Sequence, residues 1–366
     1  MRKFDYLDAI RGFAIIGVMM VHSNQHGLPI EGNFKSIVNN GSFGVQLFFV
    51  ASAFTLFLSH ESRKEENNST VNFFFRRFFR IAPMFYLGII YYLWQDGFGP
   101  RYFLGDQKSI TFENVLSTVT FTNSFNPYWI NSIVPGGWSI AIEFLFYGSL
   151  PFLLFKVIKN LNSAFLFFIA SILFSLCCNY YLSYHQLIPE STLWKDYLYL
   201  YFPSQLPVFI IGIITYYIVI KEESLKDINS NSLLLLCLMV LIQYSTSIIF
   251  FKQHIMISIG FGLLIYVLSK NNYKIIVNSF TKFIGKISFS LYLSHFAILF
   301  WMEKFNLVDF LPERLFVNYG IRLLITFILS IPVAYLCYNF IEKPFIKLGS
   351  QIIHWHNLER DRRIRQ

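Results

Sequence analysis

The chain has few charged side chains for its length. Only 14% of its 366 residues are Asp, Glu, Lys or Arg, whereas about 25% is usual in soluble globular domains. Hydrophobic residues make up 55% of the sequence, and the mean hydropathy is +0.48. The four cysteines all lie in apolar stretches and have no disulfide or metal-ligand spacing. This composition excludes a soluble domain, predicts no metal site, and indicates that lipid surrounds most of the chain.

The net charge of +9 does not indicate nucleic-acid binding, because of where the basic residues lie. Most of the 30 Lys and Arg residues fall on alternate connections between apolar runs. The positive-inside rule predicts this asymmetry for a chain with both termini in the cytoplasm. Arg2 and Lys3 precede the first apolar run, but no small-residue cleavage site follows that run. We therefore expect a retained helix rather than a signal peptide.

The apolar runs predict an all-α integral membrane protein with about ten transmembrane helices and both termini cytoplasmic. We expect one transmembrane domain over residues 1–348 and a basic cytoplasmic tail over residues 349–366, which meets anionic lipid head groups or solvent. The long outward connection over residues 95–136 is a suitable binding surface for a large polar partner. The predicted spans are 8–24, 43–60, 81–95, 137–155, 163–182, 204–220, 232–250, 255–269, 287–303 and 318–340.

Arg11 and His22 are unexpected residues for the first membrane helix. A charged group within such a helix costs roughly 2.5 kcal/mol or more on insertion scales, so it needs a purpose. The two residues are eleven positions apart, which places them on one helix face about 16 Å from each other. Arg11 would lie at the cytoplasmic end and His22 toward the outer half. A lone membrane histidine is often structural, so both a catalytic and a structural role are open.

Three arginines precede the third predicted span. Arg76 and Arg80 are four residues apart and Arg77 and Arg80 are three apart, so a helix would gather them into one cationic patch. The preference for basic residues on the cytoplasmic side of a membrane helix would by itself account for two of these three arginines. Three guanidinium groups at this spacing also suit the phosphates of a nucleotide such as that of coenzyme A.

A polar stripe lies on the helix that follows Gly136. Ser139, Glu143 and Tyr147 are spaced four and four, next to Trp138. A carboxylate in this setting must be paired or protonated, because an isolated buried charge is too costly. We expect Glu143 to pair with His22 or with an arginine, and pairing with His22 would fix the tautomer of that histidine.

A second stripe is formed by Ser288, Tyr292 and His295, which are spaced four and three. Hydrogen bonding between membrane helices is one use for such a stripe. A direct role for His295 in a site is the alternative.

Together, these residues resemble the acyltransferase 3 family of integral membrane acyltransferases, many of which O-acetylate bacterial surface polysaccharides. The resemblance spans residues 5–346, and its strength lies in the order of the motifs rather than in any single one. One departure is Ala53, where the family usually has glycine. The matching motifs are Arg11 with His22, Gly44 to Ser52, Arg76 with Arg77, Arg80 and Pro83, Trp138 with Ser139, Glu143, Phe146 and Tyr147, Ser288 to His295, and Ile341 to Pro344.

The resemblance implies acyl-CoA, most simply acetyl-CoA, as a co-substrate rather than a permanently bound cofactor. It also implies a lipid-linked or surface glycan as acceptor, and a multi-pass location in the bacterial inner membrane. Some relatives carry a fused extracytoplasmic domain, and we expect this chain to act without one. Direct transfer and a covalent acyl-enzyme are both compatible with these residues.

The roles that follow combine the resemblance with the chemistry of each side chain. Arg76, Arg77 and Arg80, with Arg11, would bind the phosphates of the donor. His22 would be the general base, since an unperturbed imidazole pKa of about 6.5 suits proton removal from a hydroxyl. Glu143 would orient His22 or stabilise its protonated form. Trp138, Ser139, Tyr147, Ser288, Tyr292 and His295 would support the site.

Two other functions compete with acyl transfer. A transporter of a glycan or lipid intermediate could use the same charges to lead an anionic substrate through the bundle, but the repeated halves with broken helices that many transporters show are not visible in the sequence. A purely structural membrane partner would not require arginine, histidine and glutamate within its helices.

Overall fold

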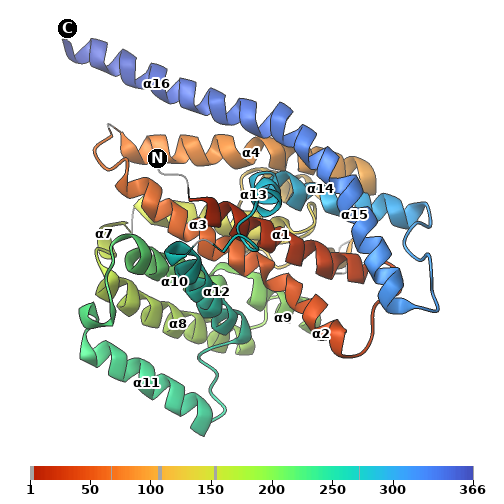
Figure 1. Cartoon of the computed structure of the whole chain (residues 1–366), viewed down its shortest axis with the longest axis horizontal. Coiled ribbons are helices and arrows are strands. Elements are labelled where there is room, and N and C mark those ends of the chain that lie inside the picture. Colours follow the sequence, from red (N-terminus) through yellow and green to blue (C-terminus); the bar gives the residue numbers. More distant parts are fainter. Residues whose placement is uncertain (1–3, 67, 106–108, 152–154, 272, 366) are drawn as a thin grey trace.

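The structure is a computed structural model that describes residues 4–66, 68–105, 109–151, 155–271 and 273–365, without the side chains of 358–365. Within these ranges the chain is helical and has no strand (Figure 1). A π-helical turn, η6 (Tyr338–Glu342), joins the last two helices. The α-helices are α1 (Asp5–Gln25), α2 (Asn33–Asn39), α3 (Gly44–Glu61), α4 (Ser69–Asp96), α5 (Phe112–Val119), α6 (Gly137–Ser149), α7 (Phe155–Val157), α8 (Leu161–Tyr184), α9 (Ser191–Leu200), α10 (Phe202–Ile220), α11 (Ser230–Ser245), α12 (Gln253–Lys270), α13 (Ser279–Lys286), α14 (Ser288–Lys304), α15 (Leu315–Cys337) and α16 (Lys343–Arg365).

The length and composition of the helices confirm a multi-pass helical protein but not the number of ten spans. Each predicted span overlaps a helix, yet α6 and α11 are short, and α4 begins with the arginine cluster. Helices α13 and α14 are bent by 77° relative to each other, and counting this pair as one more span raises the number of candidate spans from six to seven. The cytoplasmic position of the termini stays a prediction. In the described part of the chain, the helical segments long and apolar enough to cross a membrane are these six: Asp5–Gln25, Asn33–Glu61, Leu161–Tyr184, Ser191–Ile220, Gln253–Lys270 and Leu315–Asn357.

Helix α1 lies inside the bundle and packs against α3, α13, α14 and α15 (Figure 1). At its crossing with α13 the two backbones nearly touch, because a Cβ atom on Gly285 would lie only 1.7 Å from the carbonyl oxygen of Asp8. Glycine is therefore required there, as small residues are at close helix contacts in membranes. This contact fixes Arg11 and His22 relative to the bent pair α13–α14.

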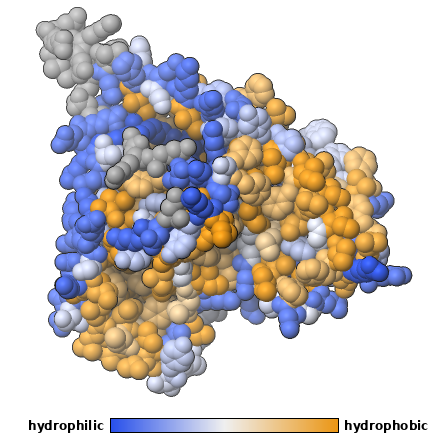
Figure 2. Space-filling view, viewed as in Figure 1, coloured by the Kyte–Doolittle hydropathy of each residue, from blue (hydrophilic) through white to orange (hydrophobic). Residues whose placement is uncertain are grey.

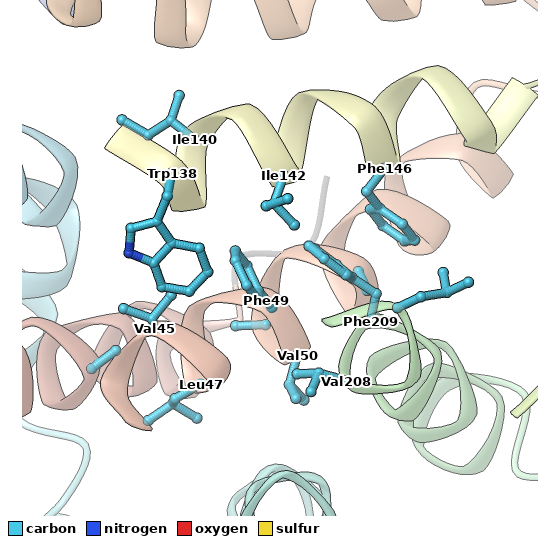
Figure 3. Close-up of a cluster of buried hydrophobic side chains, with 14 of the residues drawn as sticks. Val45, Leu47, Phe49, Val50, Trp138, Ile140, Ile142, Phe146, Val208 and Phe209 are labelled. Atoms are coloured by element: carbon cyan, nitrogen blue, oxygen red, sulfur yellow. The ribbon is translucent and has the colours of Figure 1, made fainter. Parts of the chain in front are cut away.

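Helices α3, α6 and α10 meet in an aromatic core (Figure 3). Phe209 of α10 stacks on Phe49 of α3 and on Phe146 of α6, with ring centroids 4.4 Å and 4.1 Å apart. Trp138 packs edge-on against Phe49, at 6.0 Å. Since this core takes up one face of α3 and one of α6, other faces of the two helices carry the polar side chains described below.

The connection between α4 and α6 is held by Arg101. Its guanidinium group donates hydrogen bonds to the carbonyl oxygens of Ser132 at 3.0 Å, Ile133 at 2.8 Å and Gly97 at 2.9 Å. One side chain thus ties the start of this connection to its end, just before α6. The position of the N-terminus of α6, and of Gly136 before it, follows from these bonds.

The surface is divided between apolar and polar regions. Figure 2 shows hydrophobic residues over the right side and the lower left of one face and hydrophilic residues along the upper left, where α4 begins. Large apolar side chains such as Leu241 of α11 and Leu263 of α12 are 62% exposed, which suits contact with lipid. Helix α16 runs alongside α4 (Figure 1). The arginines of the predicted tail, at positions 360–365, lie outside the side chains that the structure describes.

Candidate active site

A cavity lies among α1, α3, α4, α6 and the start of α14, with about 720 Å³ of empty space including its open part. Most of the residues predicted for the site meet here, although their helices are far apart in the sequence. The lining residues are Arg11, Val45, Phe48, Phe49, Ser52, Thr55, Arg77, Arg80, Ile81, Ser139, Ile140, Glu143, Tyr147, Ser288, Phe289 and Tyr292.

Arg11 lines the cavity from α1. Its guanidinium group donates a hydrogen bond to Thr55 Oγ1 at 3.2 Å and lies 3.4 Å from Asp8 Oδ1. Asp8 is three residues earlier on the same helix, so it balances part of the charge of Arg11 without covering the side that faces the cavity.

Arg77 and Arg80 line the cavity from α4. The guanidinium carbon of Arg77 lies 5.7 Å from the ring centroids of both Phe73 and Tyr147, and its Nε atom has no hydrogen-bond partner. Within the described part of the chain, Arg80 has neither a hydrogen bond nor an ion pair. Two guanidinium groups therefore stay available for an anion in the cavity.

Arg76 is separated from the other arginines of its cluster. It does not line the cavity, and its two terminal nitrogens contact the two carboxylate oxygens of Glu66 at 3.1 Å and 2.5 Å. This two-point contact uses the geometry that would otherwise bind a phosphate. The sequence spacing groups Arg76 with Arg77 and Arg80, but the connection before α4 supplies a carboxylate that holds Arg76 elsewhere.

Glu143 belongs to the cavity wall and not to the surroundings of His22. Its Oε1 atom accepts hydrogen bonds from Tyr147, at 2.6 Å, and from Ser52. Among the described residues, Glu143 and His22 form no hydrogen bond with each other, so the first of the two expected pairings, with His22 or with an arginine, is not formed. The physical reason is that a hydroxyl one turn along α6 and another on the facing α3 already satisfy the carboxylate. Glu143 does share the cavity with Arg11, Arg77 and Arg80.

Ser139 and Tyr292 lie together in the wall of the cavity. Both hydroxyls donate to the carbonyl oxygen of Gly136, at 2.9 Å and 3.0 Å, and they lie 3.0 Å from each other. Gly136 has φ +74°, and a Cβ atom there would lie 2.5 Å from the Tyr292 hydroxyl. Only glycine allows this backbone conformation and this approach together. Because both hydroxyls donate to a carbonyl, neither offers a free donor in this arrangement.

The other residues that we expected to support the site lie in different places. Ser288 lines the cavity, whereas Trp138 belongs to the aromatic core behind it. Within the described residues, no group of three or more His, Cys, Asp or Glu side chains could hold a metal ion.

His22 and His295 lie next to each other outside the set of residues that line the cavity. Their ring centroids are 5.5 Å apart, and Phe296 packs against both rings at 4.4 Å and 4.1 Å. His22 Nδ1 is 2.7 Å from Gln25 Oε1. His295 is fully buried, with its Nδ1 atom 3.0 Å from the carbonyl oxygen of Leu291.

The histidine pair lies farther along α1 and α14 than the residues of these helices that line the cavity. Arg11 and His22 are separated by roughly 16 Å along α1, and Ser288, Tyr292 and His295 follow one another along α14. The rings of Tyr292 and His295 are 6.1 Å apart. Tyr292 thus stands between the cavity and the two histidines.

Sequence reasoning quoted Gly44 to Ser52 as a matching motif but gave no role in the site to the face of α3 that lines the cavity. Phe48, Ser52 and Thr55 are spaced four and three and all contribute to the wall. This helical spacing of two hydroxyls within an apolar segment was the available signal. Gln25, the partner of His22, had no comparable signal, because it is a polar residue at a helix end.

These observations define a multi-pass helical protein with a cationic internal cavity and two neighbouring histidines beyond it. Sequence comparison then gives the family. The chain belongs to the acyltransferase 3 family: the model of this family, described as an acyltransferase domain, matches residues 4–339.

Curated relatives come from Staphylococcus aureus. The chain is 24% identical over 393 residues to "Putative O-acetyltransferase SAR0937" of strain MRSA252, and 25% identical over 391 residues to "Putative O-acetyltransferase SACOL0978" of strain COL. These alignments cover 98% and 97% of this chain but 59% of each relative, so the chain spans about three fifths of their length. No solved structure matches the chain.

Proposed function

We propose that this protein transfers an acyl group, acetyl in the simplest case, from cytoplasmic acyl-CoA to a hydroxyl group of an extracytoplasmic glycan such as a surface polysaccharide. The observation that carries the proposal is the arginine-lined cavity, whose Arg11 lies on the same helix as His22. The family and the names of the relatives support acyl transfer. The multi-pass helical fold supports a location in the membrane, which we assign to the bacterial inner membrane.

The donor would enter at the arginine end. Arg11, Arg77 and Arg80 face one carboxylate in the cavity wall, Glu143, so the cavity is suited to an anion. Phosphate groups bind guanidinium groups in a two-point geometry, and the nucleotide end of CoA presents several phosphates. Its thin pantetheine arm would then extend past apolar wall residues such as Ile140 toward the outer side.

His22 is the group we assign to proton transfer. Its Nδ1 atom faces Gln25 Oε1, which can only accept a hydrogen bond, so Nδ1 carries the proton and the Nε2 lone pair is free. As the acceptor oxygen bonds to the thioester carbon, its proton passes to His22 Nε2. The carbon–sulfur bond then breaks, and the CoA thiolate takes that proton. Because Glu143 is bonded within the cavity, we assign it to charge balance at the donor site.

Labelled acetyl-CoA tests the proposal against the rival function of transport. Membranes that contain the protein are incubated with acetyl-CoA labelled in the acetyl group, and label is measured in the glycan fraction. We expect label in glycan with the wild type, and a loss of roughly 10² or more in turnover for His22→Ala at unchanged affinity for a CoA analogue. His26→Ala is the matched control, since His26 is one turn away and pairs with Glu303 at 2.7 Å.

Two results would contradict the proposal. Glycan without label in the presence of folded wild-type protein would favour a transporter. Normal turnover in folded His22→Ala protein would remove His22 as the base.

A further inference from the structure

His295 has a buried nitrogen atom that the proposed reaction has not used. The side chain is fully buried, and its Nε2 atom has no hydrogen-bond partner. The Nδ1 atom lies 3.0 Å from the carbonyl oxygen of Leu291. A carbonyl oxygen can only accept a hydrogen bond, so the proton of the neutral ring is on Nδ1 and Nε2 carries a lone pair. His295 is therefore an acceptor without a donor.

Leaving such an acceptor unsatisfied in a buried site is unfavourable. Native proteins retain few groups of this kind, and those retained often serve a function. A neighbour that could supply a donor is His22, whose ring centroid is 5.5 Å away. Two imidazoles joined by a direct N–H···N hydrogen bond of about 2.9 Å have their centroids roughly 5 Å apart. The spacing of the two rings is therefore close to that needed for a protonated Nε2 of His22 to donate a hydrogen bond to Nε2 of His295.

We propose that His295 is a positioning residue for the protonated form of the base, in which its Nε2 lone pair accepts a hydrogen bond from the Nε2–H of His22. This inference rests on the proposed function, in which His22 takes the proton of the acceptor hydroxyl. His22 in that state carries a positive charge, and its Nε2 atom becomes a donor. The lone pair of His295 stabilises this charged form until the proton is passed to the departing CoA thiolate.

Other groups near His22 do not take this role. Glu143 is bonded to Ser52 and Tyr147 in the cavity wall. Among the described residues no carboxylate forms an ion pair with His22; the imidazole that does have such a contact is His26, with Glu303. Gln25 already faces Nδ1 of His22, so the neutral lone pair of His295 is an acceptor for Nε2 of the charged form.

Two substitutions separate the roles of the two nitrogen atoms of His295. The amide nitrogen of asparagine occupies nearly the place of imidazole Nδ1, so His295→Asn keeps the bond to Leu291 but loses the Nε2 acceptor. The amide oxygen of glutamine reaches the place of Nε2, so His295→Gln keeps an acceptor toward His22. We expect kcat to fall roughly 10²-fold in His295→Asn and much less in His295→Gln, with KM for acetyl-CoA unchanged in both.

A matched control is His254, another buried histidine, whose Nε2 atom is 3.0 Å from the carbonyl oxygen of Ser204. We expect His254→Gln to leave turnover unchanged. All rates are determined with labelled acetyl-CoA and wild-type membrane glycan, per mole of folded enzyme measured by thermal unfolding in detergent.

The outcomes distinguish this inference from the proposed function. If His22→Ala loses turnover but His295→Asn keeps it, the role of His295 is wrong and His22 stays the base. If His295→Asn and His295→Gln lose turnover equally, the lone pair is not what matters and the inference is also wrong. Normal turnover in His22→Ala would overturn the proposed function itself.

Discussion

The donor site predicts that Arg80 and Arg76 have different importance although they lie four residues apart on one helix. Arg80 lines the cavity and has no ion-pair partner in the described part of the chain, whereas Arg76 is held by Glu66 outside the cavity. We therefore expect Arg80→Ala to weaken the binding of acyl-CoA. Arg76→Ala should change binding little, because it removes a contact within the protein.

The magnitude follows from the contact that would be lost. A hydrogen bond to a charged group contributes about 1.5–3 kcal/mol, and about 1.4 kcal/mol corresponds to a tenfold change in binding. Arg80→Ala should therefore raise KM for acyl-CoA roughly 10- to 150-fold. Arg80 is exposed to solvent in the open part of the site, so salt and water weaken its interaction and favour the lower end of this range. The change in kcat should be small.

The assay measures transfer from labelled acetyl-CoA over a range of donor concentrations. The dissociation constant of a CoA analogue is measured on the same purified samples, since KM equals a dissociation constant only when chemistry is slow. An unchanged affinity in Arg80→Ala would refute the donor site. If Arg76→Ala lost as much affinity for the CoA analogue as Arg80→Ala, a position in the cavity would not be what distinguishes the two residues.

Three further substitutions test other parts of the structure. Glu143→Gln keeps the oxygen that accepts both of its hydrogen bonds but removes the negative charge from the donor site. Because the donor is an anion, KM for acyl-CoA should fall by roughly two- to fivefold. A collapse of kcat would instead assign Glu143 to proton transfer. Gly136→Ala places a methyl group 2.5 Å from the Tyr292 hydroxyl at φ +74°, so unfolding in detergent should occur at lower temperature, with a cost of about 1–3 kcal/mol. Arg322→Met leaves Asp309 without the fully buried guanidinium group that lies 3.0 Å from it, which should cost about 3–5 kcal/mol and reduce the amount of folded protein. Unaltered thermal stability in either of the last two variants would contradict the contact concerned.

Helical periodicity explains why part of the site was visible in the sequence. Arg11 and His22 were expected on one face of the first helix, and Ser139, Glu143 and Tyr147 on one face of another. In the structure, Arg11 lines the cavity from α1, and the three residues of α6 line it together. Spacing alone gives these relations because an α-helix turns by a fixed angle at each residue.

Contacts between helices were not predictable in the same way. Arg76 is held by Glu66, which lies before α4, and Glu143 is bonded to Ser52 on α3. His22 lies beside His295, which is 273 residues later in the chain. Spacing within one helix says which side a residue occupies, but not which helix faces that side.

The sequence by itself determined that this is a multi-pass helical membrane protein, because apolar runs of that length have to form helices in lipid. It also determined which polar residues share a helix face. Only the tertiary structure decided which of these faces meet. The crossing of α1 and α13 at Gly285 and the bend between α13 and α14 set those meetings, since close packing at small residues depends on all the helices of the bundle at once.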